Sequence, residues 1–288
     1  MDNSVDVGDR LLRSSHPVVM GVVNVTPDSF SDGGRWSTPD AAIAHGRDLL
    51  ADGADILDIG GESTRPGATR PLVEEELGRV IPVIRELSAG GATVSVDTMR
   101  SEVAEQAVAS GATIVNDVSG GLADPRILDV VADSGTTYVC MHWRGHADHM
   151  QELAAYDGPG GVVAAVRAEL SQRVDAARAA GIPDERIVLD PGLGFAKKAA
   201  HNWALLAGLG SLQTLGFRLL VGASRKSFLG SLLAGPDGSP RGVDDRESAT
   251  TALTILLAQQ GVWGLRVHDV RSSRDALRAL EHWEEASP

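Results

Sequence analysis

Eight short apolar runs, each followed by a helix-forming segment, predict that this chain folds as a single (β/α)8 barrel. The runs are rich in Val, Ile and Leu, which is typical of parallel strands that are buried on both faces. The alternation continues through the 288 residues without a break in composition. A doubly wound open sheet is the alternative, but no G-x-G-x-x-G loop follows the first run, and eight regular units favour the closed barrel.

The first strand is predicted at 18–24, and a loop rich in turn-forming residues follows it. A helix over 39–52 comes next, with Ala42, Ile43 and Leu49 on its apolar stripe. The same order then repeats. The other strands are predicted at 54–60, 93–96, 113–115, 137–141, 187–189, 217–221 and 264–267. The other helices are predicted at 72–87, 101–110, 125–133, 162–180, 201–209, from Lys226 onward, and at 272–285.

Two segments stand apart from this pattern. Residues 1–17 are polar without a clear period, so we expect a loose N-terminal leader, with the barrel formed by 18–288. Residues 235–246 are interpreted as an insertion without recognisable chemistry.

The composition excludes several classes of partner. With 43% hydrophobic and 23% charged residues, the chain is expected to be a soluble globular protein with a sizeable core. A formal net charge of −13 argues against nucleic acid and against anionic membranes. One cysteine, Cys140, rules out internal disulfides. No apolar run approaches the length of a membrane span and no signal-peptide pattern begins the chain, so we expect a cytoplasmic location.

Polar side chains stand at the ends of the predicted strands, which meet at one mouth in such a barrel. Taken singly, a strand-end Asp or Asn usually caps a turn or the next helix. Taken together, these residues form a polar ring that a plain scaffold does not require. They are Asn24, Asp97, Asn116, Asp190, Lys226, Arg266 and His268.

The ring combines two kinds of chemistry. Asp97, Asn116 and Asp190 offer acceptors and one amide donor, which suits a flat heterocycle with adjacent N–H groups, such as a guanine-like or pterin edge. Arg266 and His268 could hold a phosphate or diphosphate, with the amide oxygen of Asn24 helping to bind Mg2+. Lys226 opens a helix directly after a strand, a place that suits an anion or an electron-rich ring.

Seven motifs, in order, resemble the dihydropteroate synthase family. The similarity runs from about residue 18 to the C-terminus. The motifs are MGVVNVTPDSFSDGG at 20–34, GGESTRPG at 60–67, SVDT at 95–98, NDVSG at 116–120, DPGLGF at 190–195, GASRKS at 222–227 and RVHD at 266–269.

The resemblance implies a transferase of folate synthesis. Such enzymes join p-aminobenzoate to 6-hydroxymethyl-7,8-dihydropterin diphosphate, giving 7,8-dihydropteroate and diphosphate. It also implies Mg2+ as cofactor, a homodimer, and competition between sulfonamides and p-aminobenzoate for one site. The family mechanism is SN1-like: diphosphate leaves first, and the aniline nitrogen attacks the resulting carbocation.

The resemblance also assigns roles to residues. The implied pterin-binding residues are Asp97, Asn116, Val118, Met141, Asp190, Phe195, Gly222 and Lys226. Those for p-aminobenzoate and the closing loops are Phe30, Thr64, Arg65, Pro66, Phe195 and Ser227. Those for diphosphate are Asn24, Thr64, Arg266 and His268, with Asn24 as the Mg2+ ligand. The implied catalytic set is Asp32, Asp97, Lys226, Arg266 and His268.

Two other functions remain alternatives. One is a pterin-binding paralogue that has lost catalysis, which the presence of Phe30, Asp32, Thr64 and Arg65 disfavours. The other is a methyltransferase barrel that passes a methyl group from a folate-like pterin to a corrinoid. That reading leaves the diphosphate residues and the helix start at Lys226 without a role.

Overall fold

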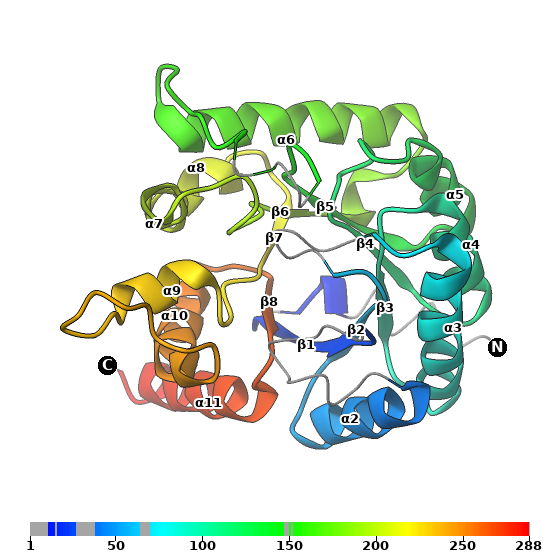
Figure 1. Cartoon of the computed structure of the whole chain (residues 1–288), viewed down its shortest axis with the longest axis horizontal. Coiled ribbons are helices and arrows are strands. Elements are labelled where there is room, and N and C mark those ends of the chain that lie inside the picture. The colour runs from blue at the N-terminus through cyan, green and yellow to red at the C-terminus, as the bar shows by residue number, and fades with distance from the viewer. Residues whose placement is uncertain are drawn as a thin grey trace.

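The sheet is a closed parallel barrel. The structure, a computed structural model, describes residues 11–14, 16–26, 38–63, 70–146, 150 and 152–287. Strands pair in chain order, and β1 (Val18–Asn24) pairs with β8 (Gly264–Val267), which closes the circle. Figure 1 looks into this barrel, with helices arranged around the strands. The predicted (β/α)8 barrel is confirmed, and the open sheet is excluded by the closing pair.

Every predicted strand is present, and no strand end is shifted by more than two residues. The second strand starts later than predicted because Asp55 uses its carboxylate to accept the Val19 N–H, at 2.7 Å. The remaining strands are β2 (Ile56–Gly60), β3 (Val94–Asp97), β4 (Ile114–Asp117), β5 (Thr137–Met141), β6 (Ile187–Asp190) and β7 (Arg218–Val221).

The helices follow the prediction with two differences. The predicted helix over 201–209 is two helices that meet at Gly208, and one helix before β8 was not predicted. Short 3-10 turns lie at Asp184–Arg186 and Asp244–Arg246. The helices are α2 (Pro39–Ala51), α3 (Val73–Ala89), α4 (Ser101–Ala109), α5 (Arg126–Ser134), α6 (Gly161–Ala179), α7 (Ala199–Ala207), α8 (Leu209–Gln213), α9 (Ser227–Leu232), α10 (Glu247–Gln259) and α11 (Val270–Glu285). Among the described residues, none of these helices has the length and apolarity needed to cross a membrane.

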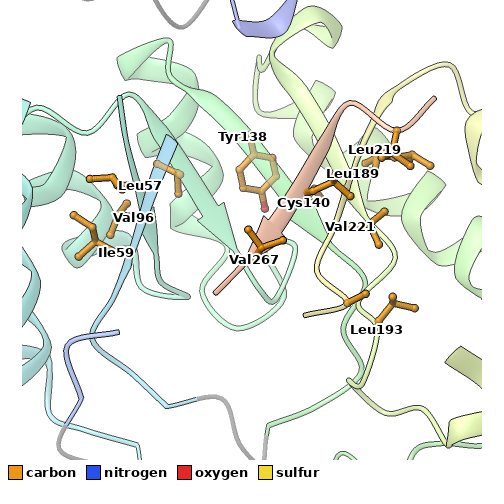
Figure 2. Packing of buried hydrophobic residues seen from close by; sticks show 14 of the residues in the cluster. Leu57, Ile59, Val96, Tyr138, Cys140, Leu189, Leu193, Leu219, Val221 and Val267 are labelled. Atoms are coloured by element: carbon orange, nitrogen blue, oxygen red, sulfur yellow. The ribbon is translucent and has the colours of Figure 1, made fainter. Parts of the chain in front are cut away.

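The main hydrophobic core lies between the strands and the surrounding helices. Figure 2 shows part of it, including Leu57 and Ile59 of β2 and Leu219 and Val221 of β7. Burying one such side chain contributes about 1.5–3 kcal/mol, so this layer supplies most of the apolar stabilisation. These residues alternate along each strand with residues that face the barrel interior.

The interior of the barrel is apolar toward the N-terminal ends of the strands. Met20, Ile56, Ile114, Val188 and Leu220 form a second buried cluster there. Because side chains alternate with a period of two, the residues two and four positions further along each strand also face inward. These later positions carry the polar side chains of the ring predicted above.

The segment before β1 packs against the closed end of the barrel. Leu12 is buried, and its carbonyl accepts from Arg218 Nε at 2.6 Å. The carbonyl of Leu11 accepts from Trp263 Nε1 at 2.9 Å. Within the described part of the predicted leader, Leu11 and Leu12 are therefore anchored to the barrel, because they satisfy donors at the start of β7 and just before β8.

Candidate active site

The inward-facing strand ends gather one set of polar side chains at the barrel mouth. Register places Asp58 beside Ser95, and Asp97 beside Asn116, on neighbouring strands. Met141 and Asp190 are paired in the same way. Of these residues, the sequence predicted Asp97, Asn116, Met141 and Asp190 for the site, but neither Asp58 nor Ser95. The inward-facing residues of the mouth are Asn24, Asp58, Asp97, Asn116, Met141, Asp190, Gly222 and Arg266.

Arg266 is the centre of this set. Its Nε donates to Asp58 Oδ2 at 2.6 Å, and its Nη2 donates to Asp97 Oδ2 at 2.7 Å. Burial raises the pKa of Asp97 to about 7; Arg266 opposes this rise, and Asp58 adds to it. The two carboxylates in turn raise the pKa of Arg266, although burial acts against them. The guanidinium is thus a permanent cation held between two carboxyl groups.

Asp58 also fixes the orientation of Asn116. The Asn116 Nδ2 group donates to Asp58 Oδ2 at 3.0 Å, so the amide oxygen of Asn116 is left to accept from a ligand. Asp58 Oδ1 and the hydroxyl of its neighbour Ser95 are buried without a hydrogen-bond partner in the described structure. Asp58 was missed because it lies inside an apolar strand, although an acid at an inward position of a buried run was a usable signal.

Asp190 is held by the loop that follows β6. Its Oδ1 accepts the backbone N–H of Gly192 at 2.7 Å. Burial raises the pKa of Asp190, and the Gly192 bond, Lys226 and Arg266 act in the opposite direction. The carboxylate keeps further acceptor positions, which suits two adjacent N–H donors.

Lys226 lies over the same loop. Its Nζ is 4.5 Å from the centre of the Phe195 ring, an arrangement in which the ring face attracts the ammonium. Gly194, with φ of +83°, leaves room for the lysine, because a Cβ there would lie 3.2 Å from Lys226 Cδ. Burial lowers the pKa of Lys226 to about 8; Arg266 also lowers it, while Asp190 and Asp97 raise it. Ser227 follows as the first, exposed residue of α9.

An apolar wall stands beside these groups. Val118 and Met141 form a small buried cluster with Met99, and Phe195 packs against it. The structure therefore brings together the three apolar residues that the resemblance assigned to ring binding. An aromatic ring can lie against this wall while its polar edge meets the carboxyl groups.

His268 and Arg266, both predicted to bind diphosphate, have different hydrogen-bond partners in the structure. His268 Nδ1 lies 2.9 Å from the Ser224 hydroxyl, which also accepts the His268 backbone N–H at 3.2 Å. The Ser224 hydroxyl can donate to a bare Nδ1 or accept from a protonated Nδ1, so this pair of contacts fixes the position of the ring in either tautomer. Arg266, in contrast, is bonded to Asp58 and Asp97 rather than grouped with His268.

Five predicted residues lie outside the described part of the chain: Phe30, Asp32, Thr64, Arg65 and Pro66. Within the described residues, no group of three or more His, Cys, Asp or Glu side chains could hold a metal ion. Asn24 offers a neutral oxygen at the end of β1, the kind of hard donor that Mg2+ accepts. Its donor type fits Mg2+ only when ligand phosphate oxygens complete the coordination.

Comparisons with known proteins agree with one another. A family model described as "Pterin binding enzyme" matches residues 20–268. The dihydropteroate synthase of Mycobacterium leprae (strain TN) is 54% identical over 94% of each chain. The solved structure of Xanthomonas albilineans dihydropteroate synthase with 4-aminobenzoic acid is 47% identical, with a TM-score of 0.85 over 96% of this chain and 95% of that one. A Yersinia pestis dihydropteroate synthase with a sulfonamide drug complex is 39% identical, with a TM-score of 0.87 over 94% and 96%.

Proposed function

The chain belongs to the pterin-binding enzyme family and, within it, to the dihydropteroate synthases, and from this premise we propose how its described residues carry out the reaction. The reaction joins p-aminobenzoate to 6-hydroxymethyl-7,8-dihydropterin diphosphate and releases diphosphate. The observation that supports the residue roles best is the group Asp58, Arg266, Asp97 and Asn116 at the mouth of the barrel.

The pterin lies with its N–H edge toward Asp190 and Asn116. Asp190 is oriented by Gly192, and the amide oxygen of Asn116 is oriented by Asp58. Both therefore present acceptors before the ligand arrives, which lowers the cost of ordering them on binding. The apolar side of the ring rests on Val118, Met141 and Phe195. Gly222, without a side chain, leaves space beside Arg266.

Asp97 and His268 face the two halves of the bond that breaks. A carboxylate at Asp97 stabilises the positive charge that develops on the pterin when diphosphate leaves. The Nε2–H of His268 donates to the departing anion, and the cation of Arg266 lies beside Asp97. The placement of Arg266 between two carboxylates revises its predicted role: it orients Asp97 as well as stabilising the leaving group.

Mg2+ belongs to the diphosphate side of this proposal. Asn24 would contribute one oxygen to it, with the substrate contributing the others. When bound, the ion adds positive charge that stabilises the departing diphosphate. Lys226 and Ser227 lie on the other side, where the ring of p-aminobenzoate can stack between Phe195 and the methylenes of Lys226. The homodimer and the cytoplasmic location stay predictions.

Product formation tests the proposed chemistry. Pterin diphosphate, p-aminobenzoate and Mg2+ should yield 7,8-dihydropteroate and diphosphate without a corrinoid. In the same assay a sulfonamide should compete with p-aminobenzoate, because it shares the aniline and places a sulfonyl where the carboxylate lies. Pterin binding without product would indicate the non-catalytic paralogue, and methyl transfer to a corrinoid would indicate the methyltransferase. Competition against pterin diphosphate alone would show that the aminobenzoate site is wrongly placed.

Asp190→Asn tests the pterin edge. The new amide keeps an oxygen for Gly192 N–H but turns a donor toward the ligand's donors. An unmatched buried polar group costs about 1–3 kcal/mol, so pterin affinity should fall at least about tenfold. Calorimetry with pterin measures the affinity, and thermal unfolding shows whether the fold is intact. Unchanged affinity in a folded variant would remove Asp190 from the site.

A further inference from the structure

The loop that carries Phe195 is tied down by a buried lysine. Lys197 is 3% exposed, and its Nζ donates to three acceptors. These are the carbonyls of Gly192 and Phe195, both at 2.9 Å, and His142 Nδ1 at 2.8 Å. The loop is therefore bonded at two points to one charged group, and through it to the end of β5.

When Lys197 is protonated, the histidine in this contact has one possible proton arrangement. An ammonium group only donates, so His142 Nδ1 accepts, and the ring proton lies on Nε2. Nε2 then donates to Glu169 Oε2 of α6 at 2.9 Å. Burial lowers the pKa of His142 to about 4, which keeps the ring neutral, as this arrangement requires. Glu169 is itself fixed by Arg144, through bonds of 3.0 and 2.5 Å.

This chain of bonds ends beside the substrate groups. Gly192 N–H orients Asp190, and the Phe195 ring lies against the ammonium of Lys226. Phe195 is half-buried and packs against the Met99, Val118 and Met141 cluster, so the backbone of the loop helps to set where its ring lies. A shift of this loop would move the ring that the proposed aminobenzoate stacks on.

We infer that Lys197 is a positioning residue for p-aminobenzoate, and that it acts by holding the Gly192–Phe195 loop through the His142–Glu169 pair. The inference rests on the proposed placement of aminobenzoate at Phe195. Lys197 does not touch either substrate, so its loss acts on the second pocket more than on the chemistry. Three acceptors match the three donors of a protonated lysine, whereas the neutral amine has only two N–H groups.

Lys197 can bond to all three acceptors only when it is protonated, so its hold on the Gly192–Phe195 loop depends on pH. Burial lowers the pKa of Lys197 to about 7; Arg144 and Lys226 lower it further, and Asp190 and Glu169 raise it. One donor is therefore lost as pH rises through about 7, and the loop loses one of its bonds. We expect the KM for p-aminobenzoate of the unmodified enzyme to rise several-fold between pH 6 and pH 8.5.

The test compares Lys197→Met with Lys198→Met. Lys198 is the adjacent, exposed lysine, so its variant controls for the loss of a charge from this segment. Lys197→Met should raise the KM for p-aminobenzoate about tenfold, because unmatched buried acceptors cost about 1–3 kcal/mol. The KM for pterin diphosphate should change less than about threefold. The rise of the aminobenzoate KM with pH should become smaller than in the unmodified enzyme, and what remains comes from Lys226, whose pKa is about 8. Lys198→Met should behave as the unmodified enzyme.

Other variants keep the inference testable. Glu169→Gln, at a position one-third exposed, is expected to fold and to raise the aminobenzoate KM about threefold, because it weakens the bond that orients His142. If Lys197→Met does not fold, an unchanged KM in Glu169→Gln overturns the inference. If it folds, an unchanged aminobenzoate KM, or equal rises for both substrates, overturns it. Phe195→Ala tests the placement of aminobenzoate separately from the role of Lys197. If that variant leaves the aminobenzoate KM unchanged, the proposed placement at Phe195 is wrong, and the inference about Lys197 fails with it.

Discussion

Replacing Arg266 with methionine is expected to lower kcat/KM about 1,000-fold, since charge stabilisation at the reacting centre is lost. The same change should lower the free energy of unfolding by about 3–5 kcal/mol, because it breaks buried ion pairs on one side only. Asp58 and Asp97 would then lie near each other without the cation that their Oδ2 atoms contact. One of the two carboxyl groups should take up a proton at neutral pH.

Two further variants test whether the effects of Arg266→Met come from the loss of the cation between Asp58 and Asp97. Arg271→Met removes an arginine from an exposed ion pair with Asp52, so it should leave stability and kcat/KM unchanged. Arg266→Met combined with Asp58→Asn should recover part of the lost stability, because only one carboxylate remains. Calorimetry of Arg266→Met with free pterin and with pterin diphosphate then distinguishes pterin binding from diphosphate binding. Equal losses of affinity for both ligands would remove Arg266 from the diphosphate site. Near-normal kcat/KM in a folded Arg266→Met variant would contradict its central place.

Gly192→Ala is expected to destabilise the protein by about 3–4 kcal/mol, from a clash added to a strained backbone. A Cβ on Gly192 would lie 2.3 Å from the carbonyl oxygen of His142. That oxygen belongs to the backbone at the end of β5, so it cannot turn away as a side chain would. The shift would also weaken the bond from Gly192 N–H to Asp190, so pterin affinity should fall as well.

Gly135 supplies the matched control for this change. Its φ of +63° is close to the +66° of Gly192, but no atom lies within 4 Å of the added methyl group. Gly135→Ala should therefore cost only the backbone strain, about 1 kcal/mol. Urea unfolding of both variants measures the difference. Equal losses of stability would show that the clash with His142 is relieved without cost.

The strands were predictable because their residues signal burial directly. The mainly apolar runs at 18–24 and 137–141 match β1 and β5 without a shift. The helix α10 was missed for a specific reason. Its buried stripe is Thr250, Leu253, Thr254 and Leu257, so half of the apolar face is threonine. The hydroxyl of Thr254 bonds to the carbonyl of Thr250, which lets a polar residue occupy a core position that the sequence pattern does not reveal.

The candidate site was predictable wherever a polar residue ends a strand. Asp97 and Asp190 stand at such positions, and the barrel architecture alone brings them together. Asp58 lies before the end of its strand, and its importance depends on contacts with Arg266 and Asn116 from distant strands. Lys197 lies in a loop next to a second lysine, and only the folded chain places its three acceptors around it. A sequence pattern predicts single helices and strands, whereas the roles of Asp58 and Lys197 depend on contacts between different elements.

The pairing of β1 with β8 has a consequence for how the molecule is made. Val18 lies opposite Gly264 in the sheet and donates its N–H to the carbonyl of Trp263, yet almost the whole barrel sequence separates these residues. Contacts of high sequence separation form slowly, and this one becomes available only after β8 has left the ribosome. Until then the outer edge of β1 presents unpaired N–H and C=O groups, which can recruit a strand from another chain. The nascent protein is therefore most exposed to aggregation just before its last strand arrives.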